Sequence, residues 1–470
     1  MSDKKLKKDF TEGPIFVRMI IFAIPIILTG LLQLCYNMAD NIVVGKFSGD
    51  EFALAAVGAT GSLNTLIVNL LMGIGAGAGV VVAHCYGAKN EKMISRAVHT
   101  SITFSAFAGI GFAFLFFFIS KPALGWMGIN PLFINKSILY MRILAFGIPA
   151  SAVYNYAAAI LRNVGDSKTP LLILSSSGIL NVLLNLLFVI VFHMTVDGVA
   201  LATIISQYAS ATAAIFVLIK RKNVSYNFSP RKMGIDKSIL KRALRLGIPQ
   251  GIQGAMFSIA NVILVSSMNE FDGYIFTGYT ITNQIDGILY HFCIGFAVAS
   301  LTFTAQNYGA KKPQRIKKVL IYSLVQVTVV GIIVGQLVLL LNEPLAHLFM
   351  PEESINQDHI IATVEELTAL LLSTYFLLGI MEVLSGSMRG LGYSIVQMIL
   401  YVAGICATRL IWIATAFPLN KTPFFLMLCY PISWIVTIIL LGTSRIIAGF
   451  KLKKQLNATL EPEESSAAKI

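Results

Sequence analysis

Long apolar segments dominate this sequence and restrict the chain to a membrane fold. A helix needs about 20 mostly apolar residues to cross a bilayer, and twelve segments meet that length. The composition agrees, because 56% of the 470 residues are hydrophobic and only 13% are charged, against roughly 25% charged in soluble proteins. We therefore predict an all-α polytopic membrane protein with twelve transmembrane helices. The segments are 15–44, 55–83, 98–119, 138–160, 170–192, 198–219, 247–268, 276–305, 319–341, 365–388, 393–416 and 424–445.

The basic residues set the orientation of these helices. With the N-terminus in the cytoplasm, 30 of the 36 Lys and Arg fall on the inner side. The other six are Lys46, Lys121, Lys136, Arg142 and Lys421 on the outer side, and Arg409 inside a span. This asymmetry is the positive-inside pattern of membrane proteins. It predicts a multi-pass protein of the cell membrane with both termini cytoplasmic, and it explains the net charge of +13 without a nucleic-acid partner.

The sequence lacks the marks of an enzyme or a metal protein. It contains no HExxH, GxSxG or Walker A motif, and its five cysteines stand singly in apolar stretches with no CxxC. We expect no metal and no cofactor. We expect membrane lipids as partners and a monomeric protein.

Three short motifs recur at nearly one spacing, which indicates an internal duplication. "FAIP" at 22–25 returns as "LGIP" at 246–249, "YGAKN" at 86–90 as "YGAKK" at 308–312, and "LRNVG" at 161–165 as "MRGLG" at 388–392. The offsets in numbering are 224, 222 and 227, respectively. Since each half holds six spans, both halves insert in the same orientation. We predict two parallel six-helix lobes at 1–219 and 246–450, a basic cytoplasmic linker at 220–245, and a disordered cytoplasmic tail at 451–470.

Several segments resemble the multidrug and toxic compound extrusion (MATE) transporters of bacteria. They are "NMADNIVVGKFSGDEFALAAVGAT" (37–60), "YGAKN", "LRNVGDSKTP" (161–170), "LNVLLNLLF" (180–188), "GVALATIISQ" (198–207) and "MRGLG". The resemblance covers nearly the whole chain in the right order. It implies a secondary active antiporter that exports cationic, amphiphilic drugs or toxic compounds in exchange for protons or sodium. The alternative within the same superfamily is a flippase of a lipid-linked precursor.

Polar side chains inside the first lobe follow helical spacing. Three predicted helices each carry one stripe of polar residues on one face. Because polar groups facing lipid are costly, we expect the stripes to converge on a wet cavity. The stripes are Gln33, Tyr36, Asn37 and Asp40; Ser177, Asn181 and Asn185; and Thr203, Ser206, Gln207 and Ser210.

Asp40 is the carboxylate of these stripes and our candidate for the coupling-ion site. The resemblance supports this, since Asp40 matches the acidic coupling residue of MATE relatives, and Asn181 and Thr203 match its supporting ligands. Asn185 stands where many relatives have an aspartate, which favours a single protonation event over a sodium site. The alternative is an interfacial Asp40 that caps its helix. We assign the coupling site to Asp40, Asn181, Thr203, Asn185 and Tyr36.

The second lobe differs from the first. With an offset of 224, the position equivalent to Asp40 is Leu264. The remaining deep charges are Asp286, Glu382 and Arg409, and two interpretations remain open. Either an ion pair of one acid with Arg409 holds the lobe together, or the acids attract cationic cargo. We predict a substrate cavity lined by Gln33, Asn37, Asn155, Gln207, Asp286 and Glu382.

Two further features concern packing and motion. Overlapping GxxxG pairs, Gly73–Gly77 and Gly75–Gly79, predict close helix packing. Pro25 lies well inside the first predicted span, where it removes a backbone hydrogen bond and should bend the helix. We predict that Pro25 acts as a gate for the segment that carries Asp40, the alternative being a fixed bend that serves packing.

Overall fold

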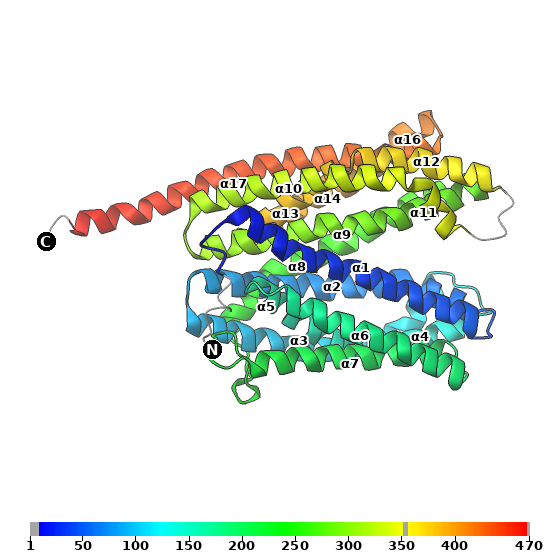
Figure 1. The fold of residues 1–470 in the computed structure, drawn as a ribbon, viewed down its shortest axis with the longest axis horizontal. Helices are drawn as coiled ribbons and strands as arrows, with labels where there is room; N and C mark the ends of the chain where they lie inside the picture. Colours follow the sequence, from blue (N-terminus) through cyan, green and yellow to red (C-terminus); the bar gives the residue numbers. More distant parts are fainter. Residues whose placement is uncertain (1–8, 351–355, 468–470) are drawn as a thin grey trace. The chain divides into compact units, whose positions relative to one another are not determined.

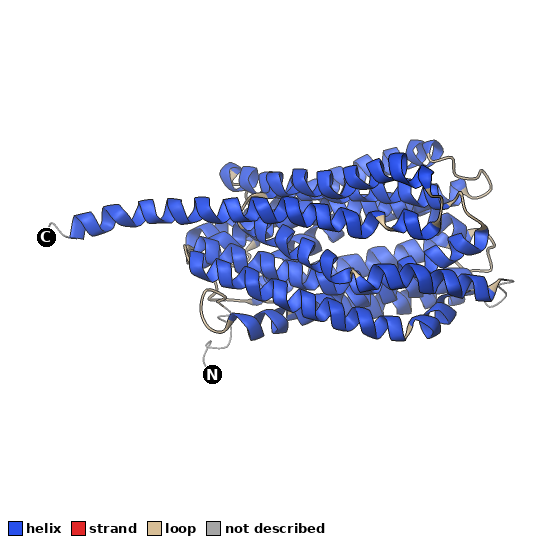
Figure 2. Cartoon of the chain, turned by 90° about the horizontal axis from the view of Figure 1, so that it is seen from above, coloured by secondary structure: helices blue, strands red, loops and turns tan. Residues whose placement is uncertain are grey.

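The computed structural model describes residues 9–350 and 356–467, and for residues 62 and 454–467 it describes the backbone alone. Within these ranges the chain forms helices joined by short loops and contains no strand (Figure 2). Four of the basic residues counted on the inner side, Lys4, Lys5, Lys7 and Lys8, lie outside these ranges.

The helices follow the predicted apolar segments closely. The α-helices, labelled in part in Figure 1, are α1 (Ile15–Phe47), α2 (Ala53–Gly87), α3 (Glu91–Trp126), α4 (Ile134–Ala145), α5 (Ile148–Asn163), α6 (Lys168–Leu186), α7 (Val196–Lys220), α8 (Lys237–Met268), α9 (Gly273–Gly309), α10 (Pro313–Leu340), α11 (Asn342–Phe349), α12 (Gln357–Ser373), α13 (Tyr375–Gly390), α14 (Ser394–Val402), α15 (Thr408–Ile411), α16 (Pro423–Met427) and α17 (Cys429–Ala467). Among the described residues, three turns are π-helical, at Leu187–Val191, Ala403–Ala407 and Trp412–Ala416, and two are 3₁₀, at Pro230–Lys232 and Phe417–Leu419.

The described residues supply up to twelve membrane spans, as the sequence predicts. Ten helical segments are long and apolar enough to cross a bilayer, and two bent pairs bring the number to twelve. The pairs are α4 with α5, bent by 50°, and α12 with α13, bent by 45°. The first bend precedes Pro149, which has no N–H and is tolerated in the first turn of α5. At the second, the Thr374 hydroxyl donates to the Leu370 carbonyl, which ties the end of α12 to its own last turn.

The chain forms two compact units. We call residues Pro25–Ala255 the N-unit and residues Asp9–Ile24 with Met256–Ile470 the C-unit. The sequence divides the lobes between helices, whereas the units divide inside α1 at Pro25 and inside α8 after Ala255. The first turns of α1 pack within the C-unit, where Phe10 stacks on Phe303 at 3.9 Å and Gln326 donates to the Phe16 carbonyl.

In the N-unit, α2 lies against α3 and α5, and α7 lies against α5 and α6. The glycines of α2 set how close its neighbours come. A Cβ on Gly73 would lie 2.3 Å from the Gly251 nitrogen, and a Cβ on Gly77 would lie 2.3 Å from the Gly247 nitrogen. The other pair faces α5, at Tyr156 and Asn163. The GxxxG pairs therefore serve close packing, against α8 on one side of α2 and against α5 on the other.

The basic linker is docked on the N-unit. Its part between the α-helices is 221–236, because α8 begins at Lys237. The Asn227 amide group donates to two carbonyls in the last turn of α7 and to the carbonyl of Arg221, which follows the helix. The Ser229 amide donates to His99 Nε2 at 3.0 Å, and the Asp236 amide donates to the Thr100 hydroxyl at 3.0 Å. Both acceptors lie in α3.

In the C-unit, α9 packs against α10, α12 and α13, and α13 packs against α10 and α17. The last helix continues past the apolar segment to Ala467, where the sequence predicts a disordered tail. Residues after Lys451 include Leu, Gln, Ala and Glu, which favour a helix once α17 has been nucleated.

Candidate functional site

The three polar stripes of the first lobe meet on α1, α6 and α7 of the N-unit. Asn185 Nδ2 donates to Asp40 Oδ1 at 2.5 Å and to Asn181 Oδ1 at 3.5 Å. Asn181 Nδ2 contacts Thr203 Oγ1 at 3.5 Å, and that hydroxyl donates to the Val199 carbonyl at 3.0 Å. Four of the five residues assigned to the coupling site thus form one hydrogen-bonded series, which we call the Asp40 chain.

The Asp40 chain is strong at one end and loose at the other. The Asn185 contact is short and involves an ionisable acceptor, the kind of hydrogen bond that is stronger than a neutral one. The two contacts at 3.5 Å are at the limit of hydrogen-bond length. Asn185 is fully buried and Asn181 is 6% exposed, while Asp40 is half-buried. The carboxylate therefore lies at the accessible end of a series that continues into the N-unit.

Asn185 leaves one polar atom unused. Its Oδ1 is buried and has no hydrogen-bond partner in the described part of the chain. A buried amide oxygen without a partner costs about 1–3 kcal/mol. The Asn185 oxygen stays unpaired while the two N–H groups of the same amide donate to Asp40 and Asn181.

Tyr36 lies beside the Asp40 chain but is not part of it. Its hydroxyl donates to the Ser175 carbonyl at 3.1 Å. Its ring covers Gly178 so closely that a Cβ there would lie 1.9 Å from a ring carbon. Tyr36 therefore joins α1 to α6 by packing, one turn before Asp40.

The residues predicted to line the cavity in the N-unit are less closely grouped. Gln33 and Asn37 are exposed on α1, and Asn155 bonds to Ser151 within α5. Gln207 is half-buried, and its Oε1 has no partner within the described residues. That oxygen lies against Gly147, where a Cβ would approach it to 2.2 Å.

The two acids of the C-unit make separate contacts. Glu382 in α13 is 3% exposed and accepts a hydrogen bond from the Tyr401 hydroxyl at 2.8 Å. Asp286 in α9 is half-buried, and the Tyr375 hydroxyl donates to its backbone carbonyl at 3.1 Å. Tyr401 carries no signal in the sequence, because it lies in the next helix and no regular spacing connects it to Glu382.

The ion pair considered for Arg409 does not form. Among the residues that the structure describes, neither Asp286 nor Glu382 lies within 4.0 Å of its guanidinium. Arg409 instead donates to Asn261 at 3.0 Å and to Ser433 at 3.4 Å. The structural ion-pair interpretation is therefore wrong for this conformation, because neutral groups reach the guanidinium first.

Pro25 lies inside a continuous α1. The Thr29 hydroxyl donates to the Pro25 carbonyl at 2.6 Å, so a side chain one turn further along α1 competes for the proline's own backbone acceptor. Such local bonding is a recognised cause of helix bending. The boundary between the two units also falls at Pro25.

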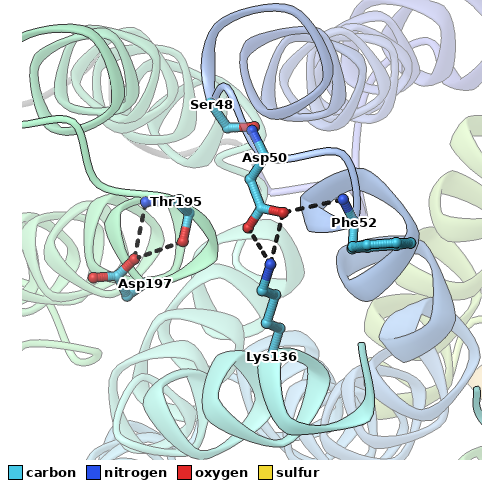
Figure 3. A network of polar contacts seen from close by, with 6 residues as sticks. All are labelled: Ser48, Asp50, Phe52, Lys136, Thr195 and Asp197. Carbon is cyan, nitrogen blue, oxygen red and sulfur yellow. Dashed lines mark hydrogen bonds and ion pairs between the residues drawn. The ribbon is translucent and has the colours of Figure 1, made fainter. Parts of the chain in front are cut away.

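An ion pair outside the spans connects the loop between α1 and α2 to α4 in the N-unit (Figure 3). Both oxygens of Asp50, in the loop between α1 and α2, accept from Lys136 Nζ at 2.6 Å, and the Phe52 amide donates to Asp50 at 3.0 Å. The hydrogen bond from Lys136 holds the pKa of Asp50 below its ordinary value. Nearby, Thr195 donates to Asp197 at the start of α7.

Comparison with known proteins decides the family. The MatE family model matches residues 25–187 and again residues 249–414. The chain belongs to the MatE family. The second matched segment begins at the offset that separates "FAIP" from "LGIP" and ends at the offset that separates "LRNVG" from "MRGLG".

Individual MatE proteins resemble the chain over most of its length. A probable multidrug resistance protein of Bacillus subtilis, YoeA, is 28% identical over 380 residues, covering 80% of this chain and 81% of the relative. A probable multidrug resistance protein of Thermotoga maritima, NorM, is 24% identical over 406 residues, covering 83% of each. The solved structure of a MATE protein in complex with MaL6 superimposes with a TM-score of 0.88 at 22% identity, covering 96% of this chain and 100% of that one. The chain is therefore a multi-pass membrane transporter and not an enzyme.

Proposed function

We propose that this transporter exports cationic, amphiphilic compounds in exchange for protons, and that Asp40 is the residue that binds the coupling proton. The observation that carries the proposal is the Asp40 chain, which connects a half-buried carboxylate to buried neutral groups on α6 and α7. The relatives YoeA and NorM are named as probable multidrug resistance proteins, which supports drugs as the transported compounds.

The orientation of Asn185 favours a proton over sodium. The amide presents an N–H donor to Asp40, whereas a bound cation would require its oxygen. One carboxylate that accepts a single strong hydrogen bond is suited to alternate between ionised and protonated forms.

The unused oxygen of Asn185 provides a response to protonation. A protonated Asp40 becomes a donor, so rotation of the Asn185 amide would present Oδ1 to the new O–H. Asn181 would then lose its donor and rotate in turn, and Thr203 can serve either orientation because a hydroxyl both donates and accepts. The contacts at 3.5 Å leave room for this rearrangement.

Protonation can drive transport only through a difference in proton affinity between two conformations. We propose that the rearranged Asp40 chain favours a more strongly bent α1, with Pro25 as the bending point. Protons that enter from outside would then shift the N-unit towards release of the exported compound. The cytoplasmic position of both termini belongs to the same proposal, because it places the positive-inside segments correctly.

The test is transport in proteoliposomes with proton and sodium gradients imposed separately. We expect ethidium movement to follow the proton gradient in the parent protein and to be lost in Asp40→Asn. The matched control is Asp50→Asn, which removes a carboxylate of the same unit from the outer loop and should retain gradient-driven transport. Full transport by Asp40→Asn, or transport driven by sodium alone, would overturn the proposal.

A further inference from the structure

Arg409 is a buried cation inside a membrane span of the C-unit, and its helix is irregular on both sides. The side chain is 1% exposed. It lies in α15, a short segment between π-helical turns at Ala403–Ala407 and Trp412–Ala416. Such π-turns are rare and frequently occur at functional sites.

Neutral groups surround the guanidinium. Nη1 donates to Asn261 Oδ1 at 3.0 Å and Nε to Ser433 Oγ at 3.4 Å. The ring of Tyr430 lies 4.0 Å from the guanidinium carbon and that of Phe257 lies 5.5 Å away. Nη2 has no hydrogen-bond partner within the residues that the structure describes.

The charge of Arg409 is therefore not matched by a direct counter-ion. Within the described part of the chain, no carboxylate lies within 4.0 Å of its guanidinium. A buried charge without a paired partner carries a large desolvation cost. A protein that needed only packing here would be served by an apolar residue, such as the buried Leu264 on the neighbouring α8.

The internal repeat relates this cluster to the Asp40 chain. In the register of the repeated motifs, Asn261 in α8 corresponds to Asn37 in α1, and Ser433 in α17 corresponds to Ser206 in α7. The helices that carry the C-unit cluster are therefore the counterparts of those that carry the Asp40 chain.

Arg409 itself takes the place of an amide. It lies one position beyond the counterpart of Asn181 in the register of "LRNVG" and "MRGLG". The preceding π-turn contains one extra residue, which brings Arg409 into line with Asn181 in α6. Each unit thus carries a polar cluster on three equivalent helices: α1, α6 and α7 in one, and α8, α15 and α17 in the other.

The two clusters have opposite charge. Asp40 supplies the N-unit cluster with a carboxylate, and its equivalent in the C-unit is Leu264. Arg409 supplies the C-unit cluster with a guanidinium at the position of a neutral amide.

We infer that Arg409, with Asn261 and Ser433, is the binding site for the carboxylate of an aromatic amphiphile that the protein carries. A guanidinium edge matches a carboxylate in geometry. The Tyr430 and Phe257 rings beside it suit a flat aromatic scaffold.

This inference rests on the proposed drug export, and its test separates the two. The probes are a rhodamine ethyl ester, which is a cation, and its free acid, which adds a carboxylate to the same scaffold. Binding of each dye to purified protein in lipid nanodiscs and its transport in proteoliposomes are measured for the parent and for Arg409→Gln. We expect the free acid to bind about tenfold more weakly to the variant, the cost of one charged hydrogen bond, with the ester nearly unchanged.

Two further variants address structure and charge separately. Asn261→Asp places a carboxylate beside the guanidinium, so it should weaken binding of the free acid although Arg409 is intact. Arg445→Gln is the matched control, because Arg445 is a buried arginine of the same unit that bonds to Ser387. We expect it to leave the ratio of the two affinities unchanged.

The outcomes are distinct. Selective loss of the free acid in Arg409→Gln and Asn261→Asp supports the carboxylate site. Equal loss of both dyes, or an unchanged ratio in both variants, overturns it while ester transport by the parent still upholds drug export. Failure of the parent to transport the ester would instead contradict the proposed function.

Discussion

The close contact between α2 and α8 predicts that a larger residue at Gly77 destabilises the protein. A Cβ at this position would lie 2.3 Å from the Gly247 nitrogen and 2.4 Å from the Ala243 carbonyl oxygen. Since carbon atoms pack at about 3.5–4.0 Å, the two helices would have to separate by about 1 Å. Both obstacles are backbone atoms, which cannot rotate aside as a side chain can.

Gly77→Ala should therefore destabilise the N-unit. Overpacking of this kind costs about 1–3 kcal/mol. Against it stands the gain of about 0.5–1 kcal/mol that alanine brings to a helix interior, so the free energy of unfolding should fall by roughly 0–2.5 kcal/mol. The matched control is Gly58→Ala in the same helix, where a Cβ would meet nothing within 4 Å and the helix gain alone remains.

The assay is unfolding of the purified protein by titration with sodium dodecyl sulfate, followed by circular dichroism. We expect Gly77→Ala to unfold at a lower detergent fraction than Gly58→Ala, and Gly58→Ala to equal or exceed the parent. If the two variants unfold together, the close approach of α2 and α8 does not determine stability and the packing argument fails.

Three further predictions concern ion pairs and the gate. Lys136→Met should lower the free energy of unfolding by less than about 1 kcal/mol at neutral pH. Because the pKa of Asp50 is lowered in the fold, the ion pair stabilises the protein only while Asp50 is ionised. The difference between variant and parent in unfolding titrations should therefore vanish as the pH falls below about 4. Asp166→Asn should cost more, about 1–3 kcal/mol, because burial opposes ionisation of Asp166 while bonds from Thr169 and Arg221 outweigh it and lower its pKa; equal losses in the two variants would contradict this order. Pro25→Ala should slow turnover without changing equilibrium drug binding. If distances between spin labels on the second half of α1 do not change with pH in the parent protein, Pro25 does not act as a gate.

Hydropathy and helical spacing predicted most of this fold and some of the contacts within the candidate site. The spans follow from apolar length, and the Asp40 chain follows from three stripes that share one helical period. Residues on one helix face can be identified from sequence because the period is fixed. The repeat identified the two halves, and the family match begins and ends at the same offsets.

The features that could not be predicted from the sequence depend on contacts between helices that are distant along the chain. The bend between α4 and α5 lies within a continuous apolar segment, so hydropathy did not reveal it. The boundary between the two units lies inside α1 because residues before Pro25 pack in the C-unit. There Phe10 contacts Phe303, which is far along the chain. Arg409 was recognised as a deep cation, but its partner Asn261 was not, because no local period connects α8 to α15.

The duplicated architecture explains why two charged clusters of opposite sign can exist in one membrane protein. A charge inside the bilayer is tolerated only where neighbouring helices supply hydrogen bonds. Once the first, fifth and sixth helices of a lobe converge to provide such a place, duplication creates a second place with the same surroundings. At the first, Asn185 serves a carboxylate; at the second, Asn261 serves a guanidinium. An amide can do either, since it both donates and accepts, so a cluster that contains amides can hold a charge of either sign.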